Sequence, residues 1–245
     1  GHFKTWSEAM IKVGFSPINE PGDLQLAEQA QDSLNAFFEK EIDRRRHIPG
    51  DDLISEMVRA EEAGDRLTAA EIVSQANLLL LAGNLTTTDL IGNGVMALIE
   101  NPEQQAKLRE RPELMRNAVE EILRYDSPVI SSGRIAHEDM EIGGQKVHKG
   151  DSLSVFLGSA NRDPSVHTDP DRFDIDRESA GKPIAFGRGI NIGLGRLLAK
   201  LEMRLVLGLL VEKVPSLHLA VGQNLHYYPN FSFRGPGTLY LTWDE

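Results

Sequence analysis

The sequence has 245 residues, of which 40% are hydrophobic and 26% are charged, as in ordinary globular proteins. Because it contains no cysteine, disulfides, thiolate metal sites and iron–sulfur clusters are excluded. A formal net charge of -11 disfavours contact with nucleic acid, and the apolar runs are far shorter than the roughly eighteen residues that a membrane helix needs. With neither a signal peptide nor a basic presequence, the expected location is cytoplasmic.

Helices are expected throughout the first part of the chain. Apolar residues recur at helical spacing from Leu24 to Ile42, with Asp23 as the N-cap. The turn-forming sequence at 49–52 ends this pattern, and a short helix from Leu53 to Ala63 then ends at Gly64.

A long helix is expected next. Thr68 and Glu71 form a capping box, in which the hydroxyl and the carboxylate satisfy free backbone donors at the helix start. The apolar pattern then continues to Asn101, where Pro102 forbids continuation. At 1.5 Å per residue this helix would span roughly 50 Å, and few polar side chains interrupt its middle, so we expect it to be central.

The second half of the chain combines helices with short strands. The expected elements are helices at 102–110 and 112–125, a hairpin around Gly143 and Gly144, a strand at 152–157, an irregular packed loop at 163–181, a helix at 194–214 and strands at 217–221 and 238–243. The predicted fold class is mainly α with small β-sheets (α+β). No repeat or low-complexity linker interrupts the chain, so we expect a single domain over residues 1–245.

The most informative segment is the glycine-rich loop at 183–195, directly before the last long helix. Gly187, Gly189 and Gly193 imitate a dinucleotide-binding loop, where glycines let backbone N–H groups approach a pyrophosphate. That fingerprint requires G-x-G-x-x-G inside a βαβ unit. The spacing here is different and the next segment is not a parallel strand, so this interpretation is disfavoured.

The same segment is similar to the proximal haem loop of the cytochrome P450 family, F-G-x-G-x-H-x-C-x-G. Four residues fall in register with it: Phe186, Gly187, Gly189 and Gly195. Asn191 stands at the histidine position, and Gly193 stands at the position of the cysteine that ligates the iron.

Further motifs of the family follow in its order along the chain. They are Ala82-Gly83 with Thr86-Thr87, Glu121-x-x-Arg124, Arg134 before the hairpin, Asn161-Arg-Asp-Pro, and Asp169-Pro-Asp-Arg172-Phe. The resemblance begins with a helix at Phe3 to Trp6 and covers nearly the whole chain. It implies a bacterial-type cytochrome P450-like fold that lacks the N-terminal part, in a family of haem-thiolate monooxygenases.

The resemblance also assigns roles to individual residues. Thr86 and Gly83 mark the oxygen-activation site, where Leu85 replaces the family's acid. The haem-contacting positions are Arg134, Phe186, Asn191 and Gly193, and the family's buried structural triad corresponds to Glu121, Arg124 and Arg172. Two of these residues have alternatives: the Thr86 hydroxyl can bond the preceding turn, and Arg134 can be a surface residue at a strand end.

Glycine at position 193 has no atom that could replace the thiolate, which pushes electron density onto iron and favours O–O cleavage. We therefore expect that monooxygenase activity has been lost and that neither haem nor another metal is bound. The expected function is binding, with another protein, a second copy of the chain or a small hydrophobic ligand as the partner.

Two alternatives remain, so whether the chain is an enzyme stays open. The first is an oxidoreductase that holds haem through a non-cysteine ligand or together with a separately supplied N-terminal half. The second is a fragment without activity.

Overall fold

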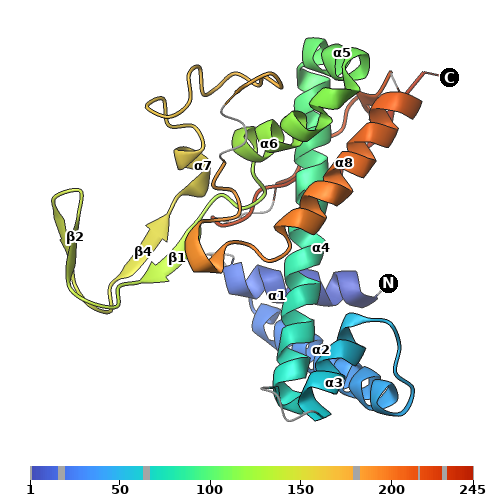
Figure 1. The fold of residues 1–245 in the computed structure, drawn as a ribbon, viewed down its shortest axis with the longest axis vertical. Coiled ribbons are helices and arrows are strands. Elements are labelled where there is room, and N and C mark those ends of the chain that lie inside the picture. Colours follow the sequence, from blue (N-terminus) through green and yellow to red (C-terminus); the bar gives the residue numbers. More distant parts are fainter. Residues whose placement is uncertain are drawn as a thin grey trace. The chain divides into compact units, whose positions relative to one another are not determined.

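The computed structural model describes residues 2–15, 20–62, 67–178, 183–214, 216–227 and 231–244. The chain divides into two compact units, Gly1–Leu85 and Thr86–Glu245. Helix α4 (Ala69–Glu100) contributes its first half to one unit and its second half to the other (Figure 1). The expectation of a single domain stays a prediction.

The first unit is built from helices around a small apolar core. Its helices are α1 (His2–Phe15), α2 (Asp23–His47), α3 (Leu53–Glu62) and the first half of α4. Buried residues from three of these helices form the core: Leu34, Phe38, Ile42, Val58, Ile72, Val73 and Ala76. The expected capping box is present, since the Thr68 N–H donates to Glu71 Oε2 at 2.8 Å and the Glu71 N–H donates to Thr68 Oγ1 at 3.3 Å.

Helix α2 begins differently from the prediction, because Asp23 is its first residue and not its cap. The chain enters the helix through Gly22, whose φ is 96°. The Asp23 carboxylate accepts instead from the Glu20 N–H at 2.7 Å and from Lys12 Nζ at 2.8 Å. It therefore fastens the preceding turn and α1.

The second unit surrounds the second half of α4 with further helices. They are α5 (Pro102–Glu110), the 3-10 turn η1 (Pro112–Leu114), α6 (Met115–Tyr125), the short α7 (Leu157–Ala160) and α8 (Arg196–Lys213). One face of α8 is buried against the core through Ala199, Met203, Leu207 and Val211. A Cβ added at Gly94 would lie 2.0 Å from Met203 Cε, so a larger residue would require the end of the buried Met203 side chain to move.

The strands pair in two-stranded antiparallel sheets. The pairs are β1 (Ser132–Ile135) with β4 (Ser152–Val155), β2 (Met140–Ile142) with β3 (Gln145–Val147), and β5 (His218–Leu219) with β6 (Leu241–Thr242). Gly143 and Gly144 both have positive φ, as a tight hairpin turn requires. The strand expected at 152–157 ends at Val155, because the chain turns into α7 and buries Leu157.

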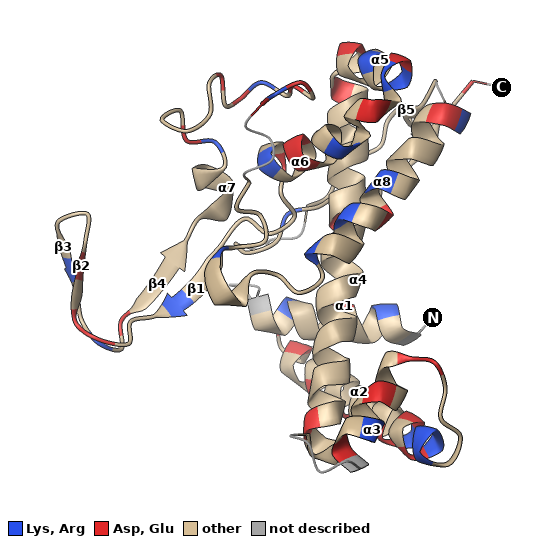
Figure 2. Cartoon of the chain, viewed as in Figure 1, with Lys and Arg blue, Asp and Glu red and all other residues tan. Residues whose placement is uncertain are grey.

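The mainly α fold with small sheets is confirmed. Figure 2 shows that α4 carries few charged side chains, as expected for a central helix. Within the part of the chain that the structure describes, no helix is both long enough and apolar enough to cross a membrane.

Candidate functional site

The glycine-rich loop that precedes α8 is closed by its own backbone. Gly187 and Gly189 have φ angles of 72° and 81°, a left-handed conformation that glycine adopts at little cost. The 3-10 turn η2 (Gly189–Asn191) follows, and the Gly193 N–H then donates to the Phe186 carbonyl at 2.9 Å. The loop thus brings position 193 back against Phe186.

Position 193 is where the resemblance places the iron ligand. A Cβ added at Gly193 would lie 3.1 Å from Phe186 Cδ1, so a larger side chain requires a small shift of the ring. Phe186 packs against the core of the second unit, and Lys200 Nζ lies 5.7 Å from its ring centre. The sequence from Pro183 to Gly195 contains neither cysteine nor histidine. The donor set of this loop therefore does not fit a thiolate-ligated iron.

The other haem positions of the family lie on separate elements. Asn191 is exposed at the end of η2. Arg134 lies on β1, and its NH1 donates to Ser132 Oγ at 2.6 Å and to the Gly133 carbonyl at 2.7 Å. Both contacts lie within β1, as expected for a surface residue at a strand end. The haem-contacting role of Arg134 stays a prediction.

Thr86 and Gly83 lie one turn apart on α4, on either side of the boundary between the units. A Cβ added at Gly83 would meet no atom within 4 Å, and Gly83 is exposed. Leu85 and Thr86 are half-buried. Because leucine cannot carry a proton, this turn of α4 lacks the acid expected next to the threonine, and an oxygen-activation role for Thr86 stays a prediction.

Glu121 and Arg124 form a fully buried, bidentate ion pair in the second unit. Arg124 Nε and NH2 donate to Glu121 Oε2 and Oε1, both at 2.8 Å, and neither side chain is exposed. The remaining donors of Arg124 reach the carbonyls of Asn161, Pro170 and Arg172. His167 is buried beside the pair, and its burial, followed by the charges of Arg124 and Arg177, lowers its pKa.

The third member of this cluster is Arg177, which corrects the assignment of Arg172. Arg177 Nε donates to Glu121 Oε1 at 3.1 Å, whereas Arg172 is exposed and contributes its backbone carbonyl. Burial alternates along this segment, since Phe173 and Ile175 are buried and the side chain of Arg177, two residues further on, is 9% exposed. That alternation is a signal from which the sequence could have identified Arg177.

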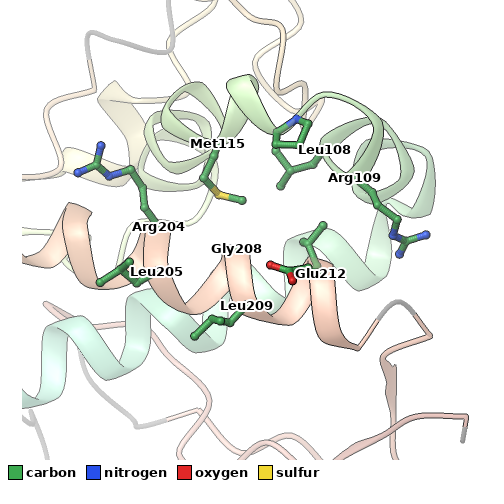
Figure 3. Close-up of a pocket in the computed structure, with 10 residues that line it drawn as sticks. Leu108, Arg109, Met115, Arg204, Leu205, Gly208, Leu209 and Glu212 are labelled. Carbon is green, nitrogen blue, oxygen red and sulfur yellow. The ribbon is translucent and has the colours of Figure 1, made fainter.

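A groove that was not predicted from the sequence lies between α5, η1, α6 and α8, with a volume of about 500 Å³ (Figure 3). Its lining is mostly apolar: Leu108, Pro112, Met115, Leu205, Gly208, Leu209 and Val211, with Arg109, Arg204 and Glu212. Figure 3 shows the guanidinium groups of Arg109 and Arg204 pointing away from the cavity at its two ends. The groove therefore presents an apolar floor between polar ends.

The outer face of α8 continues this apolar floor. Its exposed leucines are Leu197, Leu198, Leu201, Leu205 and Leu209, and Leu194 precedes the helix. A helix that is apolar on both faces is normally buried on both. We call these exposed leucines the α8 stripe. An exposed apolar surface of this kind favours binding of a partner that covers it.

Comparisons with known proteins agree with this geometry. The sequence model described as Cytochrome P450 matches residues 21–215. The chain is 42% identical over 209 residues to the biotin biosynthesis cytochrome P450 of Bacillus subtilis (strain 168), covering 85% of this chain and 52% of that protein. It is 39% identical over 244 residues to the cytochrome P450 monooxygenase PikC of Streptomyces venezuelae, covering 98% of this chain and 56% of PikC.

Solved structures give the same result. Cytochrome P450 CREJ in complex with (4-ethylphenyl) dihydrogen phosphate superposes with a TM-score of 0.94 at 34% identity, covering 99% of this chain and 60% of that chain. P450BioI in complex with hexadec-9Z-enoic acid ligated acyl carrier protein has a TM-score of 0.92 at 37% identity, covering 99% of this chain and 61% of that chain. This chain thus spans about half to three fifths of the length of these relatives. It belongs to the cytochrome P450 family.

Proposed function

We propose that this chain is a cytochrome P450 without haem-thiolate chemistry and that it acts by binding a protein partner. The observation that carries the first part is the glycine at position 193, in a loop whose sequence has neither cysteine nor histidine. Thiolate ligation supplies the electron density that O–O cleavage needs. The chain contains no cysteine, so none of its residues carries a thiol. The relative PikC is a monooxygenase by name, whereas glycine fills the position in this chain where the resemblance places the family's cysteine.

Binding to a protein is supported by the α8 stripe and the adjoining groove. The stripe runs along α8 from Leu197 to Leu209 and joins the groove, whose charged lining residues are Arg109, Arg204 and Glu212. A surface of this kind suits an apolar helix laid into the groove. The relatives extend well beyond the matched span, so the remainder of a P450 fold, joined to this chain or supplied separately, is the first candidate for this occupant.

A relative provides a second line of support. The solved P450BioI structure is a complex with an acyl carrier protein, so a protein of this fold can take a protein partner. A small hydrophobic ligand is the second candidate, because a volume of about 500 Å³ lies within the range of ligand pockets.

Titration with haemin, followed by absorption spectroscopy and size exclusion, tests the proposal. We expect no saturable uptake of haemin and a complex or oligomer that elutes ahead of the monomer. Leu205→Glu should return the elution to the monomer volume, whereas Glu103→Gln, an exposed change on α5, should leave it unchanged. Stoichiometric haem in the unaltered chain would contradict the first part, and a monomer that never takes a partner would contradict the second.

A further inference from the structure

Asp89 is a buried carboxyl in an apolar stretch of helix. It is the only charged residue of α4 between Glu71 and Glu100, and it is 2% exposed. Its Oδ2 has no hydrogen-bond partner among the described residues. Ionised carboxylates are seldom buried without a partner, because leaving water costs far more free energy than an apolar contact returns.

The C-terminal segment 231–237 lies directly on this carboxyl. A Cβ added at Gly235 would be 2.2 Å from both Cγ and Oδ1 of Asp89, so only a glycine backbone can approach this closely. One turn along α4, Asn93 Nδ2 donates to the Arg234 carbonyl at 3.0 Å. A Cβ at Gly92 would lie 3.0 Å from Pro236 Cγ. The segment 231–237 therefore packs against the face of α4 that carries Asp89, Gly92 and Asn93, which we call its seat.

The charged side chains near this face of α4 form contacts with residues other than Asp89. Arg234 Nε donates to Asp126 Oδ1 at 2.9 Å, and its guanidinium carbon lies 4.5 Å from the centre of the Tyr227 ring. Asn93 Oδ1, like Asp89 Oδ2, has no partner within the described part of the chain. Two buried acceptors one turn apart therefore lack a donor, and a proton on Asp89 would supply one.

We propose that Asp89 is a proton-binding site that makes the seating of residues 231–237 on α4 depend on pH. With the proton bound, the carboxyl is neutral and can donate. When the proton is released to solvent, a charge and two unpaired acceptors remain beneath the Gly235 backbone, and the segment opens.

The pH window follows from burial. Desolvation raises the pKa of Asp89 to about 7 from an ordinary 3.8. A raised carboxyl pKa means that the seated state binds the proton more tightly than the open state does. Seating is therefore strongest below the ordinary pKa, weakens as pH rises toward about 7, and stays weak above it.

Hydrogen exchange of the peptide 231–237, corrected for the intrinsic pH dependence of exchange, tests the device. The open fraction of the unaltered chain should rise by roughly a hundredfold between pH 5 and pH 8. This figure assumes about a tenfold rise for each pH unit below the pKa and no further rise above it. Asp89→Asn, which has the same shape and cannot ionise, should show a flat profile. Glu100→Gln, an exposed change on the same helix, should keep the rise.

A second variant keeps the test decisive if Asp89→Asn does not fold. Gly235→Ala places a methyl group against the carboxyl and should hold the segment open at every pH, with the remainder of the second unit still protected. An unaltered chain whose segment opens equally at pH 5 and pH 8, or an Asp89→Asn variant with the same rise, would overturn the proposal.

Discussion

Glu121→Gln should destabilise the second unit more than any surface change, because it removes the charge that balances buried arginines. Glu121 Oε1 accepts from Arg124 NH2, Arg177 Nε and the Asp174 N–H, and Oε2 accepts from Arg124 Nε. The glutamine keeps the shape but turns an N–H group toward arginine donors. The guanidinium of Arg124, which is not exposed, is then left without its counter-charge.

The magnitude follows from that arrangement. Breaking a buried ion pair from one side costs about 3–5 kcal/mol. Arg124 keeps its bonds to three backbone carbonyls, so we expect the lower end, about 3 kcal/mol. For a chain of this size that corresponds to a fall in Tm of roughly 6–12 °C.

Urea unfolding followed by circular dichroism measures the loss. Glu113→Gln is the matched control, since Glu113 lies in the turn directly before α6 and its ion pair with Arg111 is exposed. We expect a loss below about 1 kcal/mol for this pair. A loss that small for Glu121→Gln as well would refute the reasoning that the buried cluster holds α6 to the irregular loop.

Three further outcomes are expected. Arg177→Ala should cost about 1–3 kcal/mol of unfolding free energy and Arg172→Ala less than about 0.5, and the reverse order in urea titrations would restore Arg172 to the cluster. Gly94→Ala should cost about 1–3 kcal/mol by overpacking against Met203, and a Tm equal to that of the unaltered chain would contradict this. Above pH 7 Asp89→Asn should be more stable than the unaltered chain by about 2–4 kcal/mol, with the difference vanishing below pH 4; calorimetry at both pH values checks the sign.

The helices were predictable because their signals are local. The capping box at Thr68 and the proline at 102 fix both ends of α4, and prolines open α5 and η1. The terminal strands came out shorter than expected, with β5 reduced to His218–Leu219, because pairing with β6 limits their length. Local signals set where a helix begins, whereas a strand is set by its partner.

The polar contacts of the site depended on residues far apart in the chain. Asn93 bonds Arg234, and Asp89 lies under Gly235, contacts that periodicity in a single segment does not reveal. The motif around Arg172 predicted the location of the buried cluster but selected the wrong side chain, because the phase of the segment is set by burial of Phe173. The lack of a sulfur ligand at position 193 could be predicted from the sequence alone, because it depends only on which residue stands there and not on the fold.

The spectrum of the reduced protein under carbon monoxide, after reconstitution with haemin, tests the central claim most directly. The unaltered chain should give no band of a thiolate-ligated haem, because position 193 offers no sulfur. A thiolate-type carbon monoxide spectrum from the unaltered chain would contradict the account.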